Sequence, residues 1–271
     1  AEAAAPASRT PRRLFGVAGA VGFPAAAGAL AHLVSRRRSG AMLLGEALAL
    51  DAVFALRTLL ARADEVRAAL AADDLDGARA LLARHLVSRD TCELTASEVA
   101  GAAIESVAEN LGDGVLGPWV AYAALGLPGA AAYRALNTLD SMWGYRTERY
   151  ADLGWASARL DDLANLAPAR LAALAITGAA FAAGEDGPGA FEVWRRDAGA
   201  TESPNAGHPM AAMAGALGVR LAKRDAYVLG DGLSEPRVED LGRAIRVARV
   251  AAFGTAGAIG LALLLGGECD R

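Results

Sequence analysis

The sequence predicts an all-α fold, that of a polytopic integral membrane protein with four to six embedded helices. The chain of 271 residues is 54% hydrophobic but only 6% aromatic. Two stretches, 14–35 and 250–267, contain no Asp, Glu, Lys or Arg. Each reaches the length of about 17–25 residues that a helix needs to cross a bilayer. Arginine clusters border both stretches, as is typical where a helix meets the lipid headgroups.

Three further apolar stretches are interrupted by charge or proline. They are 41–61, 115–133 and 163–184. An Ala-rich soluble helical bundle would also contain long apolar helices, so it is the alternative to a membrane protein. No stretch shows the alternating pattern of a β-strand.

Composition excludes several functional classes. The net charge is −4, so no basic field predicts nucleic-acid binding. Cys92 and Cys269 are too far apart in the sequence for a CxxC pair, and two cysteines make no disulfide framework. Lys223 is the single lysine among 27 basic residues, and no P-loop motif surrounds it. Any nucleotide site must therefore use arginine, Mg²⁺ and backbone groups.

We predict one embedded domain over residues 1–271, with polar segments 62–114 and 185–245 in the cytoplasm. Nine of the 27 basic residues lie in 185–249, which favours that side of the membrane. If every apolar stretch crossed the membrane once, 134–162 would lie on the opposite side. We therefore expect 115–146 to form a re-entrant hairpin that lines a polar cavity, where irregular backbone is tolerated.

A helix is predicted from 96 to 111, because Thr95 and Glu98 form a capping-box pattern at its start. The glycines at 112 and 114 are expected to end it. The charged segment 62–90 is expected to be helical, with a turn near Asp73.

Carboxylates follow one face of the 96–111 helix. Glu98, Glu105 and Glu109 fall within a narrow arc, and Asp113 comes just past the helix end. Such a row could hold Mg²⁺ bound to a nucleotide, since Mg²⁺ takes hard oxygen ligands. The alternative is a solvated acidic face.

Three further polar groups could carry chemistry. The first is Arg134, Asn137, Asp140, Ser141 and Arg146, which should face a polar cavity, lie above the membrane or form a structural Arg–Asp pair. The second is Arg159, Asp161, Asp162 and Asn165, which could be only a charged helix start. The third is the loop Ser203 to Pro209, including Asn205, where a helix start could bind an anion or form an ordinary entry loop.

These polar blocks, in this order, resemble the adenosylcobinamide-phosphate synthase family of cobalamin biosynthesis. The matching blocks cover roughly residues 80–245. They are Arg89-Asp90-Thr91, Ile104 to Asn110, Asp113-Gly114, Tyr133-Arg134-Ala135, Asn137 to Met142, Gly144-Tyr145-Arg146, Ala158 to Asp162, Asn165, Pro168-Ala169-Arg170, Ser203 to Gly207 and Leu229 to Gly232.

The resemblance implies an ATP-dependent amide ligase in the bacterial inner membrane. It would join the corrinoid substrate adenosylcobyric acid to aminopropanol phosphate, giving adenosylcobinamide phosphate, and a homo-oligomer is left open. On this basis we expect Mg²⁺ at Glu105, Glu109 and Asp113, and catalysis by Asp140, Asp161 and Asp162. Substrate or nucleotide would contact Arg134, Asn137, Arg146, Arg159, Asn165, Ser203 and Asn205. A membrane transporter or channel and a non-catalytic membrane sensor are the alternatives.

Overall fold

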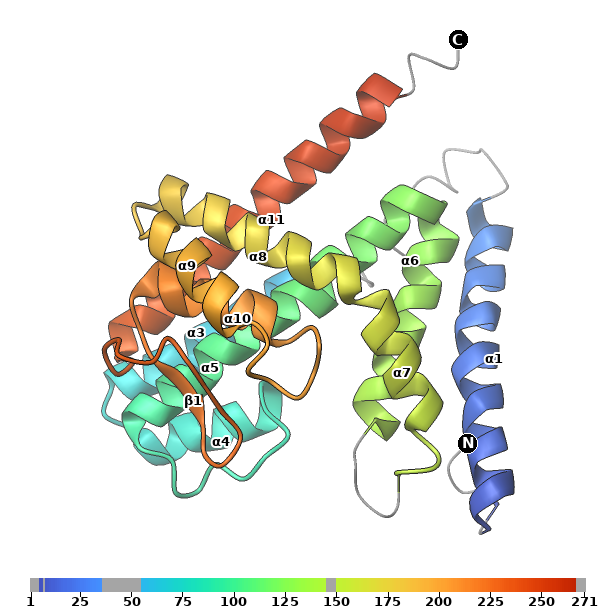
Figure 1. Ribbon diagram of the computed structural model, residues 1–271, viewed down its shortest axis with the longest axis horizontal. Helices are drawn as coiled ribbons and strands as arrows, with labels where there is room; N and C mark the ends of the chain where they lie inside the picture. The colour runs from blue at the N-terminus through green and yellow to red at the C-terminus, as the bar shows by residue number, and fades with distance from the viewer. Residues whose placement is uncertain (1–4, 7, 36–54, 145–149, 267–271) are drawn as a thin grey trace. The chain divides into compact units, whose positions relative to one another are not determined.

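The computed structural model describes residues 5–6, 8–35, 55–144 and 150–266. Helices make up about three quarters of this part of the chain (Figure 1). In chain order the elements are α1 (Arg9–Ser35), α3 (Leu56–Ala71), α4 (Leu75–His85), α5 (Ala96–Asn110), η2 (Leu111–Leu116), α6 (Gly117–Trp143), α7 (Trp155–Ala164), α8 (Leu166–Ala183), α9 (Gly187–Asp197), α10 (Gly207–Leu217), β1 (Leu221–Lys223), β2 (Tyr227–Leu229) and α11 (Val238–Gly266).

Four helical segments are long and apolar enough to cross a membrane, so the protein is an all-α polytopic membrane protein. They are Arg9–Ser35, Ala96–Trp143, Leu166–Ala183 and Val238–Ala262. Each contains, or nearly coincides with, the described part of a stretch that the sequence predicts to be embedded. The remaining predicted stretch, 41–61, lies mostly outside the described residues.

The chain divides into two compact units. One contains residues 1–54 and 117–166, and the other contains residues 55–116 and 167–271. We refer to them as the first and the second unit. The single embedded domain over residues 1–271 stays a prediction.

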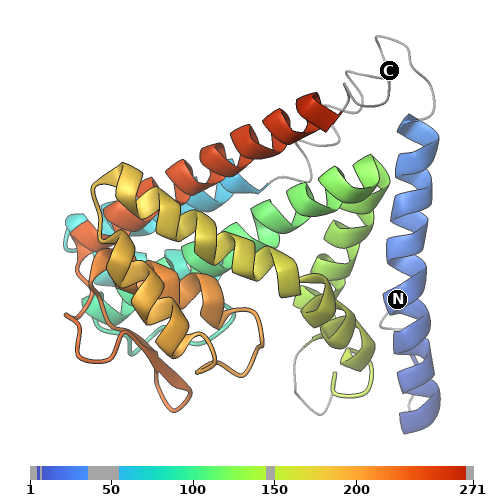
Figure 2. The same cartoon turned by 45° about the horizontal axis from the view of Figure 1, so that its top comes forward.

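In the first unit, α1 lies along α6 and also packs against α7 (Figures 1 and 2). Its buried core contains Ala20, Leu139, Trp143, Leu153 and Ala156. Helix α1 also carries large exposed apolar side chains, which a lipid environment would cover. These are Leu14, Val21, Phe23, Leu30 and Leu33.

Helix α6 is two helical arms joined at a break. Gly126 has a φ of 67°, and Pro128 follows it, a combination that ends one helix and starts another. The two arms touch, because a Cβ at Gly117 would collide with the hydroxyl of Tyr133. The predicted hairpin in this region is therefore present. Its re-entrant course through a bilayer stays a prediction.

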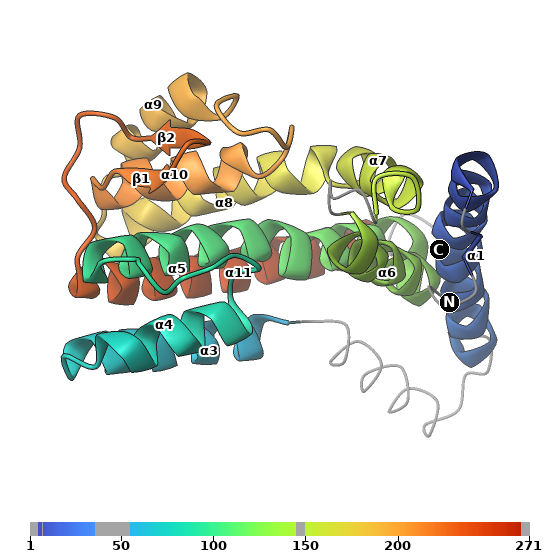
Figure 3. The same cartoon turned by 90° about the horizontal axis from the view of Figure 1, so that it is seen from below.

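In the second unit, α5 lies between the α3–α4 pair and α10, with α11 alongside it (Figure 3). The α5 side chains that pack on these neighbours are apolar and fully buried, among them Val99, Ile104 and Val107. Thr95 and Glu98 form the predicted capping box at the start of this helix. Asp74 caps α4 after a turn at Asp73, again as predicted.

Two predictions about secondary structure are wrong. The helix does not end at Gly112 and Gly114, because the chain continues through the π-helix η2 into α6. Leu111, Val115 and Leu116 are fully buried on either side of the glycines, so tertiary packing overrides the low helix propensity of glycine. The sequence also predicts no strand, yet β1 and β2 form an antiparallel hairpin. Strands of three residues are too short to show an alternating pattern.

Candidate functional site

The first group of charged residues lies on α5 in the second unit. Glu105 is buried, and its Oε1 atom has no hydrogen-bond partner in the described part of the chain. Its other oxygen, Oε2, lies 3.5 Å from Nη2 of Arg89. Glu109 follows one helical turn later and is half-buried. The acidic face is therefore not a solvated face at Glu105, because packing removes that carboxylate from water.

The β-hairpin brings two more polar side chains to this group. Lys223 and Tyr227 are directly paired across β1 and β2, so their side chains project from the same face of the hairpin. Burial raises the pKa of Tyr227, and the negative charges of Glu105 and Glu109 raise it further. The ammonium of Lys223 lies within electrostatic range of both carboxylates. We call Arg89, Glu105, Glu109, Lys223 and Tyr227 the α5 cluster.

The other two acidic residues of the predicted row lie differently. Glu98 accepts from the backbone N–H of Thr95 at 2.8 Å and forms a bidentate ion pair with Arg224 at 2.7 and 2.9 Å. Its carboxylate is thus fully used as a cap and an ion pair. Asp113 lies half-buried in η2. Within the described residues, no three His, Cys, Asp or Glu side chains gather closely enough to hold a metal ion by themselves.

The second group of polar residues lies in the first unit, where side chains form a continuous hydrogen-bonded row. Arg134 donates to Asn137 at 3.2 Å, and Asn137 donates to Asp161 Oδ1 at 3.3 Å. Asn165 donates to Asp161 Oδ2 at 2.9 Å and accepts from the hydroxyl of Tyr133. Both oxygens of Asp161 are therefore held by amide donors.

Asp140 and Asp162 lie within electrostatic range of one another, and Asp140 also lies within range of Asp161. One oxygen of Asp140, Oδ1, is buried without a hydrogen-bond partner among the described residues. Burial raises the pKa of Asp161, and the amide hydrogen bonds from Asn137 and Asn165 oppose that rise. We call Tyr133, Arg134, Asn137, Asp140, Asp161, Asp162 and Asn165 the α6–α7 cluster.

The structure describes one of the two remaining predicted arginines, and that one lies outside this row. Arg159 is exposed on α7 and makes no ion pair in the described chain, although it lies three residues before Asp162. Arg146 lies outside the described residues.

The loop before α10 is closed by its own hydrogen bonds. Ser203 Oγ accepts the backbone N–H groups of Asn205 at 3.2 Å and Ala206 at 3.4 Å. Thr201 Oγ1 accepts that of Gly207 at 3.1 Å. Asn205 is buried and accepts from Arg170 at 3.4 Å. The amide groups that could have met an anion are thus bonded internally, which favours the helix-entry loop.

Next to this loop, Nδ1 of His208 accepts from Nε1 of Trp194 at 2.8 Å. Burial lowers the pKa of His208, and the positive charge of Arg170 lowers it further. A neutral imidazole held in this way is a structural link between α9 and α10.

Sequence reasoning did not identify four residues of these clusters as site residues, namely Arg89, Tyr133, Lys223 and Tyr227. Arg89 appears in the sequence only as part of the block Arg89-Asp90-Thr91. Tyr133 lies four residues before Asn137 and seven before Asp140, a spacing that puts all three on one helix face. That spacing could have identified it. Lys223 is notable in the sequence only as the single lysine. For Tyr227 no sequence signal exists, because it is brought to α5 by a hairpin whose strands are too short to predict.

The fold and the two clusters define a class: an α-helical polytopic membrane protein that keeps buried carboxylates next to arginine, lysine and amide side chains. Comparison with known proteins gives the family. The model of the CobD/Cbib protein family matches residues 2–254, and the chain belongs to that family. No solved structure matches the chain.

Several curated relatives, each named cobalamin biosynthesis protein CobD, are similar to the chain. The protein of Geobacter metallireducens is 48% identical over 69% of this chain and 58% of its own length. That of Rhizobium meliloti is 50% identical over 72% of this chain and 60% of its own. That of Rhodobacter capsulatus is 45% identical over 83% and 72%. The chain thus spans about three fifths of the length of the first two.

Proposed function

We propose that the chain acts in cobalamin biosynthesis as an ATP-dependent amide ligase in the bacterial inner membrane. The reaction joins a carboxylate of adenosylcobyric acid to the amine of aminopropanol phosphate and gives adenosylcobinamide phosphate. Family membership supports a role in cobalamin biosynthesis, and the four apolar helical segments support the membrane. ATP is available on the cytoplasmic side, so we propose that the clusters face the cytoplasm.

The chemistry requires activation of the carboxylate, because a carboxylate is a poor electrophile at neutral pH. A carboxylate oxygen attacks the γ-phosphorus of ATP, which forms an acyl phosphate and releases ADP. The amine nitrogen then attacks the acyl carbon, the bond to the phosphate oxygen breaks, and inorganic phosphate leaves. The ammonium proton passes to a base. The protein must therefore offset phosphate charge and accept one proton.

The α5 cluster suits the phosphate part of this chemistry. Mg²⁺ is typically held by one or two carboxylates together with phosphate oxygens and water, and Glu105 and Glu109 offer two carboxylates one turn apart. The free Oε1 of Glu105 is a hard oxygen donor in a buried position. Asp113 in η2 does not lie close enough to the two glutamates to complete a set of three protein ligands. Mg²⁺, when bound, would offset the charge of the phosphate oxygens.

Positive side chains flank the same carboxylates. Arg89 reaches Glu105, and Lys223 lies near both glutamates. In this proposal they neutralise phosphate oxygens that approach the cluster, which Arg can do through two parallel hydrogen bonds. Tyr227, whose raised pKa keeps its phenol protonated, can donate a hydrogen bond to the same oxygens.

The α6–α7 cluster suits the proton-transfer part. Asn137 and Asn165 fix the orientation of Asp161, and one buried oxygen of Asp140 has no hydrogen-bond partner in the described part of the chain. In this proposal Asp140, Asp161 or Asp162 accepts the amine proton, and Arg134 contacts a substrate phosphate. Arg146 and Arg159 contribute further positive charge. Ser203 and Asn205 shape the polar loop of the second unit.

The observation that carries the proposal is that each cluster keeps a buried carboxylate oxygen without a hydrogen-bond partner among the described residues, Glu105 Oε1 and Asp140 Oδ1. Leaving a buried polar atom unsatisfied costs about 1–3 kcal/mol. Oxygens of this kind are suited to a ligand that the folded chain does not itself provide.

The test supplies the purified full chain in detergent with ATP, Mg²⁺, adenosylcobyric acid and aminopropanol phosphate. Mass spectrometry should detect the condensed product, together with one ADP and one phosphate for each amide bond. Glu109→Gln and Asp162→Asn should each lower turnover by at least about 100-fold while the protein stays folded. Glu98→Gln is the matched control on the same helix, because Glu98 is used in a cap and an ion pair, and it should keep most of the turnover.

The alternatives give different results. Substrate flux in liposomes without any amide product from folded protein would identify a transporter. If neither product nor flux is detected, the non-catalytic sensor is the remaining alternative. Near-normal turnover in both Glu109→Gln and Asp162→Asn would remove these residues from the site.

A further inference from the structure

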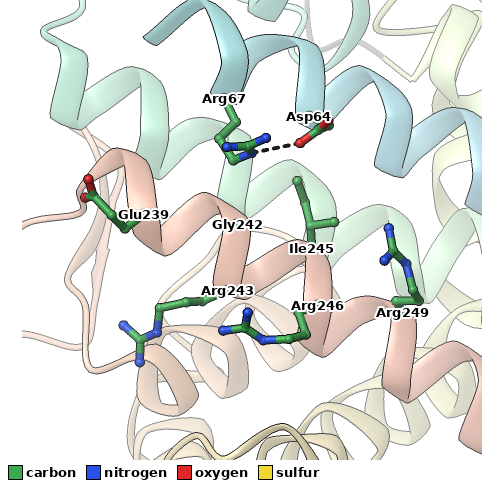
Figure 4. A pocket seen from close by; sticks show the side chains of 8 residues that line it. All are labelled: Asp64, Arg67, Glu239, Gly242, Arg243, Ile245, Arg246 and Arg249. Carbon is green, nitrogen blue, oxygen red and sulfur yellow. Dashed lines mark hydrogen bonds and ion pairs between the residues drawn. The ribbon is translucent and has the colours of Figure 1, made fainter. Parts of the chain in front are cut away.

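A hollow in the second unit is lined by none of the residues of the α5 cluster. It has a volume of about 520 Å³ and lies between α3 and the first half of α11. Figure 4 shows its lining, with one arginine from α3 and three from α11. The charged lining residues are Asp64, Arg67, Glu239, Arg243, Arg246 and Arg249. The lining thus contains four positive and two negative side chains.

One of these arginines is already fully bonded. Arg243 donates to Glu185 through Nε at 3.0 Å and also through Nη2, while Nη1 donates to Asp240 at 2.7 Å and to the carbonyl of Leu217 at 3.0 Å. The pKa of Glu185 is lowered by the hydrogen bond from Arg243. Arg243 therefore ties α11 to the unit and has little capacity for a ligand.

The other three arginines keep donors free. Arg67 donates only Nε, to Asp64 at 2.7 Å, and its two Nη atoms make no hydrogen bond in the described chain. Arg246 donates only one Nη, to Glu185 at 3.2 Å, and its side chain is 58% exposed. Arg249 is exposed and makes no hydrogen bond or ion pair with any described residue. An arginine carries five N–H donors in a plane that matches phosphate oxygens.

The position of the hollow along α11 indicates the source of the phosphate. Directly after Arg249, the segment 250–262 contains no charged residue. It leaves Phe253 66% and Leu261 58% exposed, and it belongs to a candidate membrane span. The arginines that keep unused donors therefore lie where α11 passes from protein contacts into a stretch with exposed apolar side chains, which we take to be the depth of the headgroups.

We propose that this hollow binds the phosphodiester headgroup of an anionic phospholipid. Arg67, Arg246 and Arg249 contact the phosphate oxygens, while the acyl chains follow the exposed apolar face that begins near Phe253. A hollow of about 520 Å³ is much larger than one phosphate ion, and basic pockets at the end of a membrane helix are suited to lipid headgroups.

The experiment measures lipid binding to the full chain in a neutral detergent by native mass spectrometry. The two probes are palmitoyl-oleoyl phosphatidylglycerol and the zwitterionic palmitoyl-oleoyl phosphatidylcholine. We expect the anionic lipid to bind at least about 10-fold more tightly. One basic residue near a membrane surface raises the affinity for an anionic lipid by a factor of about 5. The double variant Arg67→Gln with Arg249→Gln should therefore weaken binding of the anionic lipid by roughly 25-fold.

Two controls make the result specific. Arg84→Gln removes an exposed arginine of the same unit outside the hollow and should leave lipid binding unchanged. Arg249→Lys keeps the charge and should keep most of the affinity. Equal binding of the two lipids, or unchanged binding in the double variant, would overturn the proposal. Displacement of the lipid by an equal concentration of inorganic phosphate would show a soluble-anion site and would overturn the lipid assignment. None of these readouts depends on ligase activity.

Discussion

The substitution Asn165→Ala tests the physical basis of the α6–α7 cluster. Asn165 is only 1% exposed and joins two neighbours: it donates to Asp161 at 2.9 Å and accepts from Tyr133. Alanine removes both hydrogen bonds and cannot replace either partner. The carboxylate of Asp161 then stays buried with one donor fewer, and the Tyr133 hydroxyl loses a buried acceptor.

The magnitude follows from these two bonds. A hydrogen bond to a charged group contributes about 1.5–3 kcal/mol, and one between neutral groups contributes about 1 kcal/mol. Allowing for relaxation around the smaller side chain, we expect the free energy of unfolding to fall by about 2–4 kcal/mol. For a chain of this size each kcal/mol lowers the melting temperature by about 2–4 °C. The expected shift is therefore roughly 4–16 °C.

The loss of stability in Asn165→Ala should also depend on pH. The pKa of Asp161 in the folded chain lies above its ordinary value of 3.8, so the folded state binds this proton more tightly than the unfolded state. The resulting stability is present below the ordinary value and is lost as pH rises through the raised pKa. Removing the Asn165 donor raises that pKa further. The deficit of Asn165→Ala relative to the unchanged chain must therefore be larger at about pH 7.5 than at about pH 4.

The assay is thermal unfolding in detergent, followed by near-ultraviolet circular dichroism at both pH values. Asn110→Ala is the matched control, since the amide of Asn110 donates to Ser106 at 2.9 and 3.2 Å but the residue is exposed. It should cost less than about 0.5 kcal/mol. A deficit for Asn165→Ala that is below this control, or that does not change with pH, would refute the account of Asp161.

Three further substitutions have defined outcomes. Gly117→Ala places a methyl group on the Tyr133 hydroxyl, so it should lower the melting temperature, and adding Tyr133→Phe should restore part of the loss. Arg89→Met leaves Glu105 buried without its ion pair. Because Arg89 is partly exposed, we expect the free energy of unfolding to fall by about 1–3 kcal/mol rather than by the full cost of breaking a buried pair. In a double-mutant cycle, adding Glu105→Gln should relieve this loss. Thr95→Ala removes the cap of α5 and should cost about 1 kcal/mol by the same unfolding assay.

The parts of the fold that the sequence predicts are those that depend on local pattern. The apolar stretches of α1, α8 and α11 are long enough to be recognised by length alone. The capping box at Thr95 and Glu98 needs only residues three apart. The bond between Asp161 and Asn165 needs only residues one helical turn apart, and their spacing places them on one face.

The parts that could not be predicted depend on contacts between distant segments. The same row of glutamates fits either a solvated face or a site, and the difference at Glu105 is its burial. Tyr227 approaches that residue from more than 100 positions later in the chain. Likewise, glycines at 112 and 114 usually end a helix, but here burial of Leu111 and Val115 continues it through a π turn. Such turns inside helices often lie next to functional sites.

Hydrogen-bond satisfaction separates structural carboxylates from candidate functional ones in this chain. Asp197 bonds to Arg196 and to the backbone N–H of Gly230 at 2.7 Å, and these bonds lower the pKa of Asp197. The role of Asp197 is therefore structural. Glu105 and Asp140 each keep a buried oxygen that nothing in the described chain satisfies. Replacing such a carboxylate with the corresponding amide removes the cost of burying a negative charge and breaks no hydrogen bond of the unsatisfied oxygen. Glu105→Gln and Asp140→Asn should therefore leave stability unchanged or higher while activity falls, whereas Asp197→Asn should lower stability and spare the chemistry.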